Sequence, residues 1–276
     1  MLTLAKRQLS KPHELRKTIR AKNEVLVKEE NTAVALPIDY EGDASSGFDG
    51  MTQEDFALPY LKLLTGTSPE LGEVDGANPG MIFNSVSNDL YDGKKGIQVV
   101  PCAYLRQYVE WVPRDSSKGG APVNIFPATS DILSRTSKQP NDSKDYLDNG
   151  NYIENTATFY VLVIHSEGYT TPVVISMKST QLKKARKWNT MMMSTKMRGK
   201  DGFFTPPMYS QIYRLTSQAE SNNKGKWYGW EIERVGPIEN GKIYQDAKSF
   251  AQKVSVGDVN VKHDSEFVET DSAMPF

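Results

Sequence analysis

The feature that most constrains the fold is a succession of short segments rich in β-branched and aromatic residues, each bounded by turn-forming residues. Segments of this kind predict strands. Six of them occur between the two ends of the chain, at residues 80–86, 97–112, 152–165, 171–177, 208–217 and 226–235. A basic helical stretch separates the fourth from the fifth. The pattern therefore favours a mainly β protein with accessory helices over a parallel α/β sheet.

Five or six strands within about 155 residues fit an OB-like Greek-key barrel. We place this domain at residues 48–255, with a long polar insertion at 113–150 and a basic helix at about 179–193. Residues 1–47 read as a basic arm followed by an acidic linker, and residues 256–276 as an acidic tail. The arm and linker, which are charged and contain a Gly/Ser-containing segment, are expected to be partly disordered, and the tail is expected to be disordered.

Composition excludes several classes of protein. No run approaches the ~18 apolar residues of a membrane span, and no apolar stretch near the N-terminus reads as a secretory signal. Cys102 is the one cysteine, and the three histidines are scattered, so neither a disulfide framework nor a zinc cluster is expected. Phosphate-loop, GxSxG, HExxH and CxxC motifs are absent. We therefore expect a non-enzymatic protein of the host cytoplasm, with no catalytic residue, cofactor or metal.

The overall charge balance, 33 basic against 34 acidic residues, conceals strong segregation. Residues 178–200 contain eight cations and no acidic residue. These cations are Lys178, Lys183, Lys184, Arg186, Lys187, Lys196, Arg198 and Lys200. A block of this kind suits a polyanion such as nucleic acid, although an ordinary solvated helix face is the alternative.

A helical projection of the same block separates an apolar side from a basic side. The apolar side carries Leu182, Ala185, Trp188, Met192 and Met193, and the basic side carries Lys183, Lys184, Arg186 and Lys187. We expect the apolar side to lie on the barrel, with Trp188 as a core anchor, and the four cations to face outward. Such a ridge could neutralise phosphates.

Aromatic side chains near cations suggest base-stacking positions. Strand alternation in 97–112 puts Tyr104, Arg106 and Tyr108 on one face, predicted to be exposed, while Ala103, Leu105, Val109 and Trp111 are predicted to be buried. In the turn before 226–235, Trp227 adjoins Lys224 and Lys226. The alternatives are routine cross-strand pairing for the first group and a solubilising hairpin tip for the second.

The last thirteen residues are acidic and end in a hydrophobic tip. They contain Asp264, Glu266, Glu269 and Asp271, no basic residue, and the terminal Pro275 and Phe276. A flexible anionic segment with an apolar end and a free carboxylate suits a partner with a basic, apolar pocket. The alternative is an ordinary disordered terminus.

This tail, together with the stretches GFDGMTQEDFALPYLKLLTGTSPEL, GMIFNSVSNDLYDGKKGIQVVP and MKSTQLKKARKWNTMM, resembles phage-encoded single-stranded-DNA-binding proteins. The resemblance extends to the T7-like phage and bacterial proteins with an acidic C-terminal tail. It implies an OB fold and a role in DNA replication, recombination and repair. It also implies that the tail recruits a polymerase, a helicase or primase, or a nuclease. A homodimer is compatible with it, and no membrane is involved.

Two other functions fit the same residues. A strand-annealing recombination protein would use the same cations and assemble into rings or filaments. A phage structural or scaffolding protein would use its basic arm and acidic linker for assembly instead.

Overall fold

The computed structural model describes residues 39–51, 55, 57–113, 122–140, 142–222 and 225–257. The predictions for the basic arm at residues 1–38, for Lys224 and for the tail residues Asp264, Glu266, Glu269, Asp271, Pro275 and Phe276 lie outside this part of the chain. The chain divides into two units, Met1–Met51 and Thr52–Phe276. In the first unit, the described residues 39–51 form successive turns.

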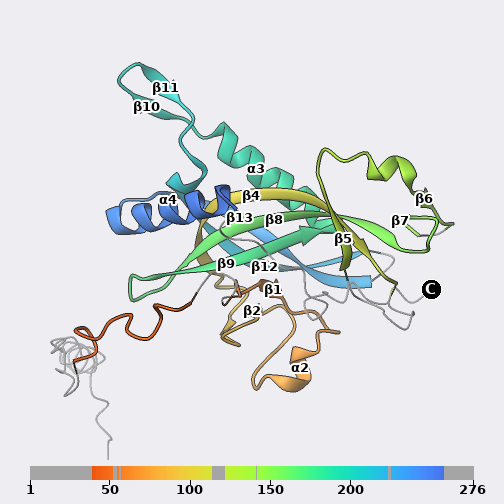
Figure 1. Ribbon diagram of the computed structural model, residues 1–276, viewed down its shortest axis with the longest axis horizontal. Helices are drawn as coiled ribbons and strands as arrows, with labels where there is room; N and C mark the ends of the chain where they lie inside the picture. The colour runs from red at the N-terminus through yellow and green to blue at the C-terminus, as the bar shows by residue number, and fades with distance from the viewer. Residues whose placement is uncertain are drawn as a thin grey trace, which may run out of the picture. The chain divides into compact units, whose positions relative to one another are not determined.

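The second unit is built on a curled antiparallel sheet (Figure 1). Its five long strands are β4 (Ile97–Trp111), β8 (Tyr152–Ile164), β9 (Thr170–Lys178), β12 (Gln211–Asn222) and β13 (Gly225–Pro237). Their spatial order is β9-β8-β4-β12-β13. The prediction of a mainly β protein with accessory helices is confirmed.

A helix covers each face of the central strand β8. Alternate residues of β8 belong to two hydrophobic clusters: Phe159 packs with Trp188 of α3 (Leu182–Ser194), and Tyr160 packs with Phe250 of α4 (Gly241–Ser255). Because both faces are buried, β8 is apolar along most of its length instead of alternating with polar residues. Asn240 caps α4 by accepting hydrogen bonds from the backbone N–H groups of the two residues that follow Gly241.

The basic helix is present, and its apolar side packs on the sheet as predicted. Ala185, Trp188 and Met192 are buried, with a spacing that repeats on one helix face. The Trp188 ring stacks on Phe159 with centroids 4.4 Å apart. Met193, predicted on the same side, is exposed. A 3-10 turn, η3 (Ser179–Gln181), leads into α3 from β9.

A second, small sheet lies against the open side of the curl. It consists of β1 (Leu61–Leu63), β2 (Ile82–Asn84) and β3 (Leu90–Tyr91), and the loop between β1 and β2 carries the short helix α2 (Glu70–Glu73). Tyr60 forms a parallel bridge with Val174 of β9, and the Ser217 N–H of β12 donates to the Gly93 carbonyl at 2.7 Å. The segment 80–86, predicted as a barrel strand, therefore supplies β2 of this separate sheet.

The polar insertion contains more regular structure than the sequence suggested. It holds β5 (Pro122–Pro127), η2 (Ile132–Arg135), β6 (Ser137–Lys138) and β7 (Asp145–Tyr146). β5 pairs with the end of β4, and β7 pairs with the start of β8. The carboxylate of Glu110 accepts hydrogen bonds from the amide groups of Asn124, Asn149 and Asn151, at 2.6 to 3.2 Å. These bonds hold the insertion to β4.

Two short strands that the sequence did not predict follow α3. They are β10 (Met197–Gly199) and β11 (Gly202–Phe204), which form a two-stranded hairpin with Arg198 opposite Phe203. The hairpin projects beyond the end of α3, away from the large sheet (Figure 1). A 3-10 turn, η4 (Met208–Ser210), then leads into β12, so this strand begins at Gln211 and not at residue 208.

Candidate nucleic-acid interface

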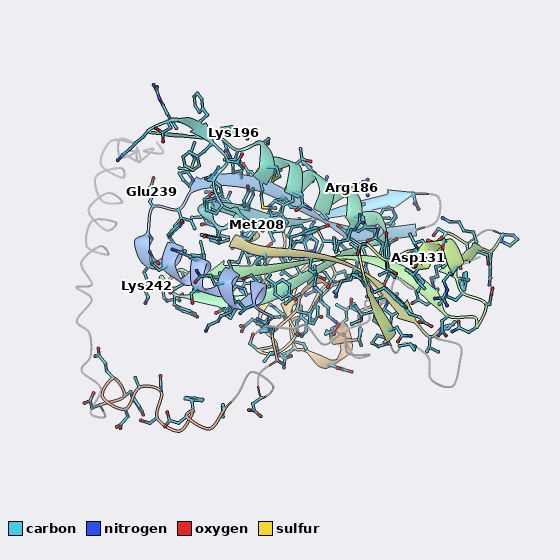
Figure 2. All side chains as sticks on the ribbon, turned by 45° about the horizontal axis from the view of Figure 1, so that its top comes forward. Asp131, Arg186, Lys196, Met208, Glu239 and Lys242 are labelled. Carbon is cyan, nitrogen blue, oxygen red and sulfur yellow. The ribbon has the colours of Figure 1, made fainter. Side chains whose placement is uncertain are left out.

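The α3 ridge consists of Lys183, Lys184, Arg186 and Lys187, the four cations that the helical projection places opposite the apolar side of α3. Lys183, Arg186 and Lys187 are exposed, as predicted. Figure 2 labels Arg186 on α3 and Lys196 at the start of the following hairpin. The apolar spacing of Ala185, Trp188 and Met192 fixes the rotation of the helix, and the cations on the other side are thereby turned toward solvent.

The expectation that Lys184 faces outward is wrong. Its side chain is 13% exposed and lies between two carboxylates, with Nζ 2.9 Å from Glu220 Oε1 and 3.1 Å from Glu231 Oε2. Glu231 also binds Lys187 Nζ at 2.7 Å. The two glutamates come from β12 and β13, so a projection of the helix alone could not reveal them. Lys184 thus fastens α3 to the β12–β13 pair.

The protonation states of Lys184, Glu220 and Glu231 follow from the same contacts. Burial alone would lower the pKa of Lys184, but its hydrogen bonds to Glu220 and Glu231 outweigh burial and raise the pKa. Burial would raise the pKa of Glu220, and hydrogen bonds from Lys184 and Trp227 lower it instead. The pKa of Glu231 is lowered, first by its hydrogen bond from Lys187. All of these groups are therefore charged at neutral pH.

Trp227 lies at the end of this network. It is half-buried, and its Nε1 donates to Glu220 Oε2 at 2.9 Å. Lys226, beside it on β13, is exposed. The indole N–H is therefore occupied by a structural contact, although part of the ring remains accessible.

The β10–β11 hairpin carries the other predicted cations. Lys196, Arg198 and Lys200 are all exposed. Two phenylalanines that sequence reasoning missed stand beside them: Phe203 is 77% exposed and Phe204 is 47% exposed. A signal was available, because the glycines at 199 and 202 enclose a two-residue turn of Lys200 and Asp201, which is a hairpin pattern.

Tyr104, Arg106 and Tyr108 do not form an exposed row. Tyr108 is buried among Ile132 and Ile153, so its predicted exposure is wrong. Tyr104 is half-buried and packs on Phe159 with ring centroids 5.0 Å apart. Tyr108 is buried because residues of the 113–150 insertion, such as Ile132, cover this end of β4, which strand alternation cannot foresee.

Arg106 is exposed at a separate groove between β4 and β5. Its Nη2 donates to the Ala128 carbonyl at 3.4 Å, and its guanidinium carbon lies 5.9 Å from the centre of the Tyr108 ring. The groove has a volume of about 610 Å³ and is lined by Tyr104, Leu105, Arg106, Gln107, Ile125, Pro127, Ala128 and Thr129. Leu105, predicted to be buried, is exposed here.

Lys178 has a structural contact as well. Its Nζ lies 3.0 Å from Glu154 Oε2 and 5.3 Å from the centre of the Trp111 ring, and its side chain is largely buried. The cations of α3 other than Lys184 and those of the hairpin are therefore exposed, whereas Lys178 is engaged by Glu154 and Arg106 lies at the groove between β4 and β5.

Neither a metal centre nor a membrane helix is found in the described part of the chain. No group of three or more histidine, cysteine, aspartate or glutamate side chains in it could hold a metal ion. No helix among these residues has the length and hydrophobicity needed to cross a membrane.

Comparison with known proteins identifies the family. The chain matches the model of a family described as Pam3 phage gp34-like protein over residues 27–260, which indicates a phage protein. Neither the curated proteins nor the solved structures gave a match. The matched span covers most of the 276 residues, and the chain therefore belongs to the Pam3 phage gp34-like protein family.

Proposed function

We propose that this phage protein binds single-stranded DNA with little sequence preference and acts in phage DNA replication, recombination and repair. The observation that carries the proposal is the cluster of exposed cations on α3 and the β10–β11 hairpin, next to two exposed phenylalanine rings. Proteins that bind single strands without sequence preference combine cations that neutralise phosphates with aromatic rings on which bases stack.

Five of these cations are available to a polyanion. Lys183, Arg186, Lys196, Arg198 and Lys200 are exposed and form no ion pair with any carboxylate that the structure describes. Lys187 shares Glu231 with Lys184 and is partly neutralised. The five exposed cations lie on α3 and on the hairpin that directly follows it, and we propose that they act on one bound strand.

The topology supports an OB-type barrel as the scaffold. When the five long strands β4, β8, β9, β12 and β13 are numbered one to five in chain order, their spatial order is three-two-one-four-five. A helix, α3, lies between strands three and four. This order and this helix position favour an OB-type barrel, an architecture that often binds oligonucleotides.

The remaining parts of the proposal rest on the resemblance and on the charges of the tail. The protein would act in the host cytoplasm without catalysing a reaction, and its acidic tail would recruit a replication protein such as a polymerase, helicase, primase or nuclease. Those roles follow only if the protein binds single strands, so strand binding is tested first.

Fluorescence anisotropy with labelled oligo-dT and with a duplex of the same length tests the proposal. We expect a preference for the single strand and a salt dependence set by the five cations. With a slope of about −0.7 per neutralised phosphate, the log of affinity should fall against log salt with a slope of about −3.5. An absence of binding at low salt, or equal binding to the duplex, would refute the proposal.

A further inference from the structure

The β10–β11 hairpin is anchored firmly at both ends, although its strands are exposed. Thr195, just before β10, is buried, and its hydroxyl donates to the Met191 carbonyl of α3 at 2.9 Å. Pro206, just after β11, is also buried. The hairpin therefore has a fixed position at the end of the α3 ridge.

The two phenylalanines of the hairpin have different surroundings. Phe204 lies opposite Met197, and its ring lies beside Gly199: a Cβ built at that glycine would be 3.2 Å from the ring. Phe204 thus rests against the hairpin. Phe203 lies opposite Arg198 on the other face and is 77% exposed. A ring so exposed contributes little to folding, because the hydrophobic effect rewards only the area removed from water.

Charge identifies the occupant of the Phe203 face. Residues 196–204 contain Lys196, Arg198 and Lys200 against the single carboxylate of Asp201. An aromatic ring flanked by cations suits a segment that offers flat bases and phosphates together. In a duplex, neighbouring base pairs cover both faces of each base, so an exposed ring can stack only on an unpaired base.

We infer that the β10–β11 hairpin is the base-stacking element of the site, with Phe203 stacking on an unpaired base while Arg198 and Lys200 contact the adjacent phosphates. This inference rests on the proposed function and deepens it. It replaces Tyr104 and Tyr108, which pack against the core, with a residue that the strand patterns did not indicate.

The test compares Phe203→Ala with the wild type on two ligands, oligo-dT and an abasic oligomer of the same length and charge. Stacking of one base on an aromatic ring predicts a loss of oligo-dT affinity of about 5- to 150-fold. Affinity for the abasic oligomer should not change, because it offers phosphates but no base. Tyr169→Ala is the matched control, since Tyr169 is an exposed aromatic in the turn between β8 and β9, and it should bind both ligands normally.

A second variant guards against a local change in structure. Phe203→Trp retains a large aromatic ring, so it should bind oligo-dT about as tightly as the wild type. Its additional tryptophan emission should be quenched by oligo-dT and not by the abasic oligomer. An increase of emission without quenching would overturn the inference.

The remaining outcomes separate this inference from the proposed function. If the wild type does not bind oligo-dT, the proposed function fails. If the wild type binds and Phe203→Ala binds equally well, the function stands and the stacking role is wrong. An equal loss on both oligomers would also overturn it. A change in self-association by light scattering, with DNA binding intact, would assign the hairpin to contact with a second copy and would refute base stacking.

Discussion

Replacing Lys184 with alanine should lower the free energy of unfolding by about 2 kcal/mol. The side chain links α3 to β12 through Glu220 and to β13 through Glu231, at 2.9 and 3.1 Å. Without the ammonium group, two carboxylates would face each other across the space it leaves, and among the described residues Glu220 would keep the hydrogen bond from Trp227.

The magnitude follows from how far each partner is buried. Exposed ion pairs contribute about 0–1 kcal/mol, whereas removing one partner of a fully buried pair costs about 3–5 kcal/mol. The side chains of Lys184 and Glu220 are 13% and 17% exposed, which is close to the buried limit. Glu231 is 37% exposed and retains Lys187, which is close to the exposed limit. Because Lys184 is shared between a largely buried and a more exposed carboxylate, removing it is expected to cost an amount between the two ranges, at about 2 kcal/mol.

Urea denaturation at neutral pH, followed by tryptophan fluorescence, measures this loss. Lys183→Ala is the matched control, because Lys183 is the preceding residue, is exposed and forms no ion pair with a described carboxylate. It should stay within about 0.5 kcal/mol of the wild type. Equal destabilisation by both variants would refute the assignment of Lys184 to a structural role.

The same contacts predict that the stability loss of Lys184→Ala depends on pH. They also predict that Lys183→Ala, which should leave stability unchanged, weakens DNA binding. The pKa values of Glu220 and Glu231 are lowered, so their stabilising contribution is present above the unfolded pKa of about 4.3 and is lost as pH falls through the folded values. The stability gap between wild type and Lys184→Ala should therefore close under acid conditions. Lys183→Ala, in contrast, should reduce the salt slope of oligo-dT binding by about 0.7.

Three further predictions concern the core and the insertion. Trp188→Ala should cost about 3–5 kcal/mol in urea denaturation, because the ring is wholly buried, and a loss below 1 kcal/mol would exclude it as a core anchor. Burial raises the pKa of the Cys102 thiol to about 12, so a thiol reagent at pH 8 should react with it only after unfolding, and rapid reaction of the native protein would contradict its burial. At Glu110, burial would raise the pKa, but hydrogen bonds from asparagines such as Asn151 lower it. Glu110→Gln should therefore lower the free energy of unfolding by about 2 kcal/mol at pH 7. In parallel urea titrations this loss should shrink as pH falls below about 4. A loss independent of pH would show that the charge of Glu110 is not involved.

Sequence patterns correctly predicted the long strands and the helix, whose own residues determine how they pack. The runs of β-branched and aromatic residues at 152–165 and 171–177, bounded by turn residues, identified β8 and β9, and the spacing of Ala185, Trp188 and Met192 identified the buried face of α3. In each case a long regular segment packs against the core along its length, so the sequence signal agrees with the folded protein.

The errors arose where a distant segment decides the environment. Tyr108 is buried because the insertion folds over it, and Lys184 is paired because two glutamates arrive from β12 and β13. Phe203 was missed for another reason, since strands of three residues are too short to show a period. The sequence therefore located the cations, but tertiary contacts decide which of them are exposed and which are paired with a carboxylate.

The small sheet of β1, β2 and β3 has a consequence for the order of folding. Its residues leave the ribosome early, yet the groups they bind, such as Val174 and Ser217, belong to strands that are synthesised much later. Closing so long a loop is entropically costly, so this sheet should dock last, and the inner apolar surface of the curl stays open to water until it does. We therefore expect the nascent protein to be most prone to aggregate before β9 and β12 have emerged.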